Sequence, residues 1–316
     1  MPDAATLPVL DIHQHLWTEG FLTELRARRA APYLDDWTLH LSGEPPSDLQ
    51  PELHDPRLRV QALRTSGQRV VIAHSSPLGV EDLPRRESRR LLDALQEGFH
   101  DLRDLEEPVG WWAALPRETA EAGPSTASQR ELGRLLDAGA VGLQIPAPWF
   151  AEPDDVIRLR PLLAQLQEAD RPLFVHPGLV PSRTSNRAAY PAWWSPVVDY
   201  GAQMATSWWA WQVAGRPSLP RLRVCFAAGA GLAPLHHERL SARGGRTPAL
   251  DPWTFVELSG YGIQVFDALL RVLGIDPLIS ASDRPYAEAL EIPHDPAANR
   301  AIRALNPQRF LTGGTP

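Results

Sequence analysis

The sequence predicts a closed parallel (β/α)8 barrel of the TIM type, and three observations lead to this prediction. Amphipathic patterns with apolar residues three and four apart predict helices between several short apolar segments. These segments are continuously apolar rather than alternating, as expected for strands covered on both sides. There are eight of them along the 316 residues, at 8–12, 69–74, 109–115, 140–145, 172–176, 222–227, 254–259 and 277–282.

A doubly wound open sheet is the structural alternative. That fold would place a glycine-rich phosphate turn after the first strand, whereas this chain has His13-Gln14-His15 there. The barrel is therefore favoured. No Gly/Ser-rich linker and no internal repeat divides the sequence, so we expect a single domain over residues 1–316.

Two long interruptions follow the first and fifth predicted strands, at 17–57 and 177–219. In a barrel both would lie at the carboxyl ends of strands, where active sites are built, so we expect lid insertions there. The first opens with Trp17, a candidate for substrate binding, and the second is rich in tryptophan. The sequence leaves open whether the tryptophans line a pocket, pack between helices or form a subunit interface.

The amino-acid composition limits the classes of binding partner that we expect. The net charge of −7 and the pI near 5.8, with scattered arginines, argue against nucleic acid and anionic membranes and favour a small-molecule substrate. The amino terminus lacks a basic region followed by an apolar one, so we expect a cytoplasmic protein. Cys225 is the only cysteine, which excludes an intramolecular disulfide. It lies in an apolar segment and is interpreted as a packing residue.

The most informative segment carries two histidines at the end of the first apolar run. His13 and His15 would point to the same face of a strand, and imidazole is the commonest metal ligand at neutral pH. His176 ends the fifth predicted strand and Asp283 follows the eighth, so all four side chains would emerge at one rim. This set suits one divalent ion, with zinc predicted and manganese or iron as alternatives.

On these segments the chain resembles the amidohydrolase superfamily, in the branch related to aminocarboxymuconate semialdehyde decarboxylase. The resemblance is carried by residues 11–15, 142–145, 173–177 and 282–286, which span nearly the full length. It implies a distorted eightfold barrel, a mononuclear metal held by His13, His15, His176 and Asp283, and either hydrolysis or non-oxidative decarboxylation. Binuclear relatives use a carboxylated lysine or a glutamate on strand four, where this chain has Gln144, so we expect one metal.

One position departs from the family pattern. The family commonly has a histidine at the end of strand six, and Ala228 stands there. His74, which closes the second predicted strand, is the preferred substitute as an acid–base residue, ahead of His236 and His237; its alternative role is to bind substrate or cap a loop.

Two more charged residues have either a functional or a structural role. Arg284 is a candidate for binding a substrate carboxylate, or else forms a structural salt bridge. Glu257 on strand seven requires a cationic partner if buried, and we expect a structural role for it.

Three functions follow as expectations. The first is a metal-dependent hydrolase in which Asp283 deprotonates metal-bound water for attack on an amide, lactone or ester. The second is a decarboxylase of a small unsaturated or aromatic acid, which would need the missing histidine more. The third is an inactive barrel that binds a partner. A homodimer is expected from the family likeness and the tryptophan-rich insertions.

Overall fold

The computed structural model describes residues 7–42, 44–103, 109–117, 125–181, 190–246 and 251–314. Eight parallel strands form one sheet in the order in which they follow each other along the chain. All eight coincide with predicted strand segments, although their ends differ by a few residues. The strands are β1 (Leu10–His15), β5 (Arg69–Ala73), β6 (Val109–Ala113), β7 (Gly142–Pro146), β8 (Leu173–His176), β9 (Val224–Phe226), β10 (Thr254–Glu257) and β11 (Leu278–Ile279).

The two edges of the sheet meet through the segment that follows β11. The backbone N–H of Asp283 donates to the carbonyl of His13 at 2.8 Å, and that of His15 donates to the carbonyl of Arg284 at 2.6 Å. Gln14 and Arg284 form the corresponding parallel bridge. β1 runs through His15, three residues beyond the predicted end, because Gln14 and His15 also pair with Ile72 and Ala73 of β5. The bonds between β1 and the segment after β11 confirm the predicted barrel architecture.

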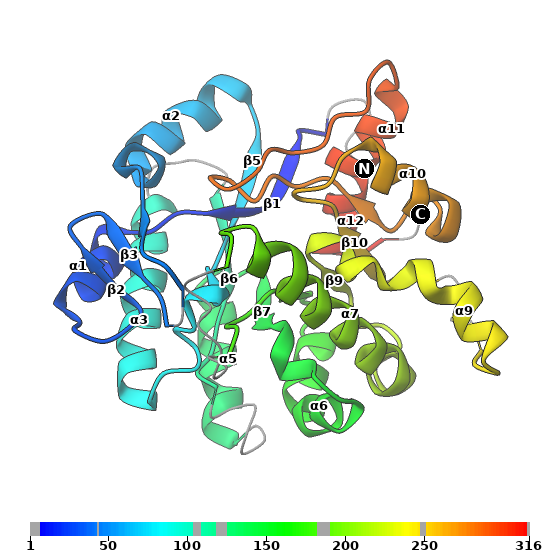
Figure 1. Cartoon of the computed structure of the whole chain (residues 1–316), viewed down its shortest axis with the longest axis horizontal. Helices are drawn as coiled ribbons and strands as arrows, with labels where there is room; N and C mark the ends of the chain where they lie inside the picture. Colours follow the sequence, from blue (N-terminus) through cyan, green and yellow to red (C-terminus); the bar gives the residue numbers. More distant parts are fainter. Residues whose placement is uncertain are drawn as a thin grey trace.

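Helices surround the sheet, and Figure 1 shows α3, α5 and α6 along its outer side. In the described part of the chain, none of them is long and apolar enough to span a membrane. The helices are α1 (Glu19–Ala27), α2 (Pro56–Ser66), α3 (Arg85–Arg103), α5 (Thr126–Asp137), α6 (Pro153–Glu168), α7 (Tyr200–Ala210), α8 (Arg216–Ser218), α9 (His237–Ala242), α10 (Ile263–Leu273), α11 (Pro296–Arg300) and α12 (Asn306–Thr312).

The first insertion, between β1 and β5, packs beside the barrel. It contains α1, which contacts α3, and α2, whose first turn is capped by Asp55 accepting from the N–H groups of Arg57 and Leu58. Between them lies a small antiparallel sheet of β2 (Tyr33–Asp35), β3 (Thr38–His40) and β4 (Ser47–Asp48). A lid function for this insertion stays a prediction.

The second insertion covers part of the carboxyl-terminal rim. Its helix α7 contacts two irregular segments that directly follow β7 and β9, a 3-10 turn at 147–150 and a kinked segment at 228–236, called here the turn after β9. The turn after β9 begins with five consecutive residues of positive φ, from Ala228 (46°) to Leu232 (60°). Residues 182–189, which belong to this insertion, lie outside the described part of the chain.

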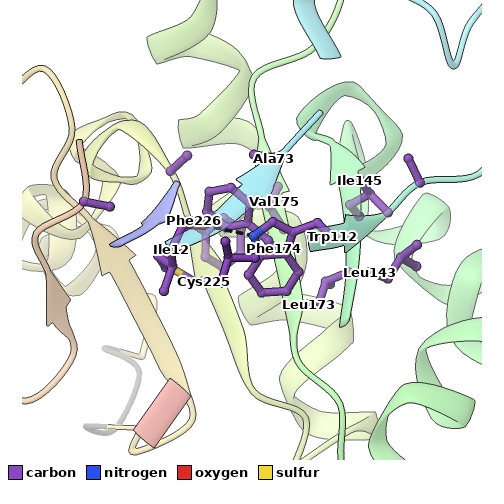
Figure 2. Close-up of a cluster of buried hydrophobic side chains, with 14 of the residues drawn as sticks. Ile12, Ala73, Trp112, Leu143, Ile145, Leu173, Phe174, Val175, Cys225 and Phe226 are labelled. Carbon is purple, nitrogen blue, oxygen red and sulfur yellow. Dashed lines mark hydrogen bonds between the residues drawn. The ribbon is translucent and has the colours of Figure 1, made fainter. Parts of the chain in front are cut away.

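The barrel interior is filled by aromatic and aliphatic side chains. Figure 2 shows Trp112, Phe174, Phe226 and Ile12 packed together, with the indole N–H of Trp112 donating to the carbonyl of Ile12 at 2.9 Å. Trp112 and Phe174 stack with ring centroids 5.3 Å apart. Cys225 is fully buried in the same core, in agreement with its interpretation as a packing residue. These packed side chains, of which Trp112 and Phe174 form an aromatic plug, close the barrel below its rim.

The approach of α7 to the turn after β9 predicts the effect of one methyl group. Gly231 has a φ of +58°, and a Cβ there would lie 2.1 Å from the carbonyl oxygen of Gly201 and 2.6 Å from the nitrogen of Ala205. We expect Gly231→Ala to lower the free energy of unfolding by about 3 kcal/mol or more, through strain and overpacking. Urea unfolding followed by circular dichroism measures this loss.

Gly244 offers a matched control, because its φ is +80° but no atom lies within 4 Å of the added Cβ. Gly244→Ala should cost only about 1 kcal/mol, from the left-handed backbone alone. Equal losses at the two positions would contradict the close packing of α7.

Candidate metal centre

Four potential metal ligands converge at the carboxyl-terminal rim of the barrel. They are His13 and His15 from β1, His176 at the end of β8, and Asp283 after β11, and their ligand atoms lie within 4.8 Å of one another. The three imidazoles are buried, whereas the Asp283 side chain is 28% exposed. Strands of the same barrel thus bring together residues that are up to 270 positions apart in the sequence.

The distances suit a common ion. The Nε2 atom of His13 lies 3.1 Å from Nε2 of His15 and 3.0 Å from Nε2 of His176. Oδ1 of Asp283 lies 2.9 Å from Nε2 of His15 and 3.3 Å from Nε2 of His13. Tetrahedral ligands about 2.1 Å from one ion are separated by about 3.4 Å. Three nitrogens and one carboxylate oxygen therefore form a donor set of suitable chemistry and size for a divalent metal.

The other nitrogen of each imidazole is occupied by a different acceptor. Nδ1 of His15 lies 3.1 Å from the carbonyl oxygen of Ala73, and Nδ1 of His176 lies 2.7 Å from that of Pro177. Nδ1 of His13 instead lies 3.2 Å from Oε2 of Glu257. A proton on Nδ1 satisfies these acceptors, so in the neutral imidazole the lone pair of Nε2 is available to an ion.

The carboxylates give His13 a distinct electrostatic position. Burial alone would lower the pKa of His13, but the charge of Asp283 and the hydrogen bond with Glu257 raise it to about 9. Burial lowers the pKa of His176, and the positive charge of His13 lowers it further. Partial burial would raise the pKa of Asp283, but the charge of His13 and the hydrogen bond with His15 hold it below its usual value. In the absence of a metal, the carboxylates therefore favour the protonated form of His13.

A second network holds the two strands that carry the ligands. Asp11 accepts hydrogen bonds from the backbone N–H of His13 at 3.2 Å, from the hydroxyl of Ser282 at 2.6 Å and from the side-chain amide of Gln14 at 2.7 Å. The Gln14 oxygen in turn accepts from Arg59 at 2.5 Å. The charge of Asp11 is thus compensated through Gln14 by Arg59.

His74, the predicted acid–base residue, lies apart from this cluster. Its Nε2 is 2.8 Å from the carbonyl of Trp112, and its ring packs against Phe99 of α3, on the outer side of β5. Burial lowers its pKa to about 4, so it is neutral at physiological pH. Because the side chain leaves the strand on the helix-facing side, we do not assign it the proton transfer.

The two predicted substrate-binding residues also have other contacts. Trp17 is 1% exposed, and its indole N–H donates to the hydroxyl of Ser75 at 3.0 Å. Its ring therefore supports the site from behind instead of offering a free surface. Arg284 forms an ion pair with Glu288, with its Nε 3.0 Å from Oε2, so the salt-bridge alternative describes this arginine.

Gln144 lies within β7, and Ala228 follows the end of β9 by two residues. The amide of Gln144 binds the backbone N–H and carbonyl of His74, at 2.9 and 2.7 Å, and it is not among the four clustered ligands. Ala228 begins the left-handed turn after β9, where the family histidine would stand. Its methyl group provides no proton donor.

Sequence reasoning missed three side chains around the cluster. Ser75 lies 3.2 Å from Nδ1 of His15, and the ring of Tyr286 lies 5.6 Å from the His15 ring while remaining 55% exposed. Tyr200, the first residue of α7, has its pKa raised by burial and then by the charges of Glu44 and Asp283. Ser75 and Tyr286 had usable signals, because Ser75 follows the end of β5 by two residues and Tyr286 comes three residues after Asp283, whereas Tyr200 depends on how the second insertion folds back.

Sequence comparisons give no match for this chain, either among protein-family models or among curated proteins. Solved structures do match it. IDCase from Metarhizium anisopliae in its apo form has a TM-score of 0.75 at 16% identity over 98% of both chains. 2,6-Dihydroxybenzoate decarboxylase from Rhizobium has a TM-score of 0.70 at 17% identity, over 97% of this chain and 99% of that one.

A third structure contains a metal. It is 5-carboxyvanillate decarboxylase from Novosphingobium aromaticivorans, complexed with manganese and a nitrobenzoic acid, with a TM-score of 0.66 at 17% identity over 96% of both chains. At these identities the likeness establishes a shared fold. The barrel implied by the resemblance to the amidohydrolase superfamily is thereby confirmed.

The comparisons correct one expectation. Hydrolysis was preferred from the sequence because Ala228 replaces the histidine that decarboxylation seemed to need, but these structural neighbours include decarboxylases of aromatic acids. The hydrolase assignment is therefore wrong. The physical reason is that the inference rested on the absence of one side chain, which does not exclude a reaction.

The buried Glu81 beside His74 leads to a prediction about pH and stability. Burial raises the pKa of Glu81 from its usual 4.5 to about 7, although Ser76 donates a hydrogen bond to it at 2.5 Å. Between these two values the unfolded chain loses the proton and the folded protein keeps it. Stability therefore falls as pH rises from 4.5 to 7, by on the order of 2–3 kcal/mol.

Glu81→Gln removes this titration. Urea unfolding of both proteins at pH 4.5 and pH 7.5 should show the variant gaining that amount relative to wild type at the higher pH. A difference between the two proteins that does not change with pH would contradict the assignment.

Proposed function

We propose that this protein is a non-oxidative decarboxylase of a small unsaturated or aromatic acid that uses one divalent metal ion. The observation that carries the proposal is the convergence of His13, His15, His176 and Asp283 at the rim of a barrel shared with decarboxylases. These four side chains are the proposed ligands. Manganese, present in a structural neighbour, is the proposed ion in preference to zinc.

The metal would bind the carboxylate or a neighbouring oxygen of the substrate and withdraw electron density from it. The chain's own residues then have three tasks, which are to orient the acid, to exclude water and to deliver a proton to carbon. The aromatic plug of Trp112 and Phe174 closes the barrel beneath the ligands, with the Phe174 ring 5.1 Å from that of His13. These packed rings therefore shield this side of the site from water.

Asp283 is the proposed proton carrier. Its contacts with His13 and His15 use Oδ1, and its side chain is the most exposed of the four ligands, so Oδ2 is assigned to the transfer. Asp283 is ionised at neutral pH, so its Oδ2 would first accept a proton from solvent at the open rim and then pass it to the carbon that bears the substrate carboxylate. The bond between that carbon and the carboxylate then breaks, carbon dioxide leaves, the electron pair restores the double bond, and Asp283 is again ionised.

Two phenols at the rim suit an oxygenated planar substrate. Burial raises the pKa of Tyr200, so its hydroxyl is protonated at neutral pH and can donate a hydrogen bond. Tyr286 exposes more than half of its side chain beside His15. Their aromatic faces and hydroxyl groups support an aromatic acid with a ring oxygen as the substrate class.

The first test is turnover by manganese-loaded protein. We expect carbon dioxide release from at least one member of a panel of hydroxybenzoic and related unsaturated acids, measured by a coupled bicarbonate assay. Asp283→Asn should lower kcat by at least about 1,000-fold, because it removes both a ligand and the proton carrier. Asp154→Asn on the exposed face of α6 is the matched control and should keep wild-type turnover.

Absence of carbon dioxide release across the panel, with metal bound at one ion per chain, would reject the proposed reaction. Equal turnover by wild type and Asp283→Asn would reject the role of Asp283 alone.

Metal removal provides a separate prediction. Dialysis against a chelator should abolish turnover, because the substrate would lose the metal ion that binds it. Added Mn²⁺ should restore turnover. The measurement is activity together with metal content by plasma mass spectrometry. His176→Ala should bind less than about one tenth of the wild-type metal. Full activity in metal-free protein would contradict the metal-dependent mechanism.

A further inference from the structure

We propose that Glu257 is a positioning residue of the metal centre, acting through His13. The inference rests on the proposed metal-dependent function, and it assigns a task to a glutamate that the sequence suggested was only structural. Its carboxylate would fix the rotation of the His13 ring, so that Nε2 faces the ion, and its charge would strengthen this imidazole as a ligand.

The position of Glu257 is determined by its own strand. It is the last residue of β10 and is fully buried. Oε2 accepts the hydroxyl of Ser259 at 2.8 Å, and Oε1 accepts the backbone N–H of the same residue. The carboxylate is thus oriented before it reaches His13, because a local turn holds both oxygens.

Burial makes the contact with His13 energetically important. A carboxylate removed from water costs several kcal/mol unless a cation or several donors compensate it. The imidazole Nδ1 of His13, 3.2 Å away, is the nearest cationic partner that the described residues provide for Glu257. When Nε2 binds a metal, the Nδ1–H of His13 carries part of the positive charge toward Glu257.

His13 differs in this respect from the other two imidazoles. Nδ1 of His15 and of His176 face neutral backbone carbonyls, those of Ala73 and Pro177. A charged acceptor forms a stronger hydrogen bond than a neutral one and raises the basicity of the opposite nitrogen. His13 also lies between the other two ligands, 3.1 Å from one and 3.0 Å from the other. Its orientation therefore influences the whole donor set.

The charges around the site agree with this assignment. Asp283 and Glu257 together supply two negative charges, which a divalent ion would neutralise. Asp11 also acts on His13, but its own charge is compensated through Gln14 by Arg59. Removal of the Glu257 charge would leave the loaded centre with an excess positive charge, which weakens binding of any dication.

The test is the dissociation constant for Mn²⁺ and for Co²⁺ of the full chain, measured by competition with a chromogenic chelator. Glu257→Gln should raise both constants by about 10- to 100-fold. The visible absorption of bound Co²⁺ should also change, because the ligand field reports the geometry of His13. Glu81→Gln is the matched control, since Glu81 is equally buried but touches none of the proposed ligands, and it should leave both readouts at wild-type values.

The measured dissociation constants distinguish a failure of the positioning role from a failure of the proposed function. Constants for Glu257→Gln within twofold of wild type, with an unchanged Co²⁺ spectrum, would overturn the positioning role and leave the proposed function intact. A wild type that binds neither ion would overturn both. If Glu257→Gln does not fold by circular dichroism, Ser259→Ala replaces it, because this change keeps the charge and frees one carboxylate oxygen. A dissociation constant for Ser259→Ala equal to wild type would then overturn the inference.

Discussion

The closure of the sheet between β1 and the segment after β11 is the constraint on which the rest of the site depends. Two backbone hydrogen bonds, from Asp283 to His13 and from His15 to Arg284, join the first and last parts of the chain. They fix the register in which the carboxylate meets the two imidazoles. A shift of β1 by one residue would turn His13 and His15 to the opposite face, away from Asp283, because successive side chains on a strand point to opposite faces.

Compensated burial of charge organises the region around this closure. Three carboxylates lie close to His13, and each is handled differently. Asp11 is compensated by Arg59 through an amide, Glu257 is held by Ser259 and faces an imidazole, and Asp283 is left partly exposed as a ligand. Of the three, Asp283 has the side chain that reaches solvent. This division of roles explains how a core of aromatic rings tolerates so many acidic groups beside it.

The loss of the strand-six histidine has a counterpart in the backbone. The turn after β9 runs through five left-handed residues, and Gly231 among them lets α7 pack directly onto it, since a Cβ there would meet the backbone of Gly201 and Ala205. Tyr200 is the first residue of the same helix, and the charge of Asp283 contributes to raising its pKa. The second insertion thus places a phenol within the electrostatic influence of Asp283.

Much of the fold and of the ligand set could be read from the sequence. The eight apolar segments predicted the eight strands, since burial on both faces selects continuously apolar runs. The spacing of His13 and His15, with histidine and aspartate after two later strands, predicted four ligands at one rim. Such inferences succeed because side-chain alternation and strand direction are local properties of the chain.

The orientation of individual side chains could not be read in this way. His74 closes a strand like His176, yet its ring turns to the outer helices, and Trp17 is buried behind Ser75. Glu257 meets His13 through a contact over 244 residues of sequence separation. The sequence by itself determined which residues could bind a metal and on which rim. Tertiary structure alone decided which of them meet, because packing against distant elements selects the side-chain rotamers and compensates the buried charges.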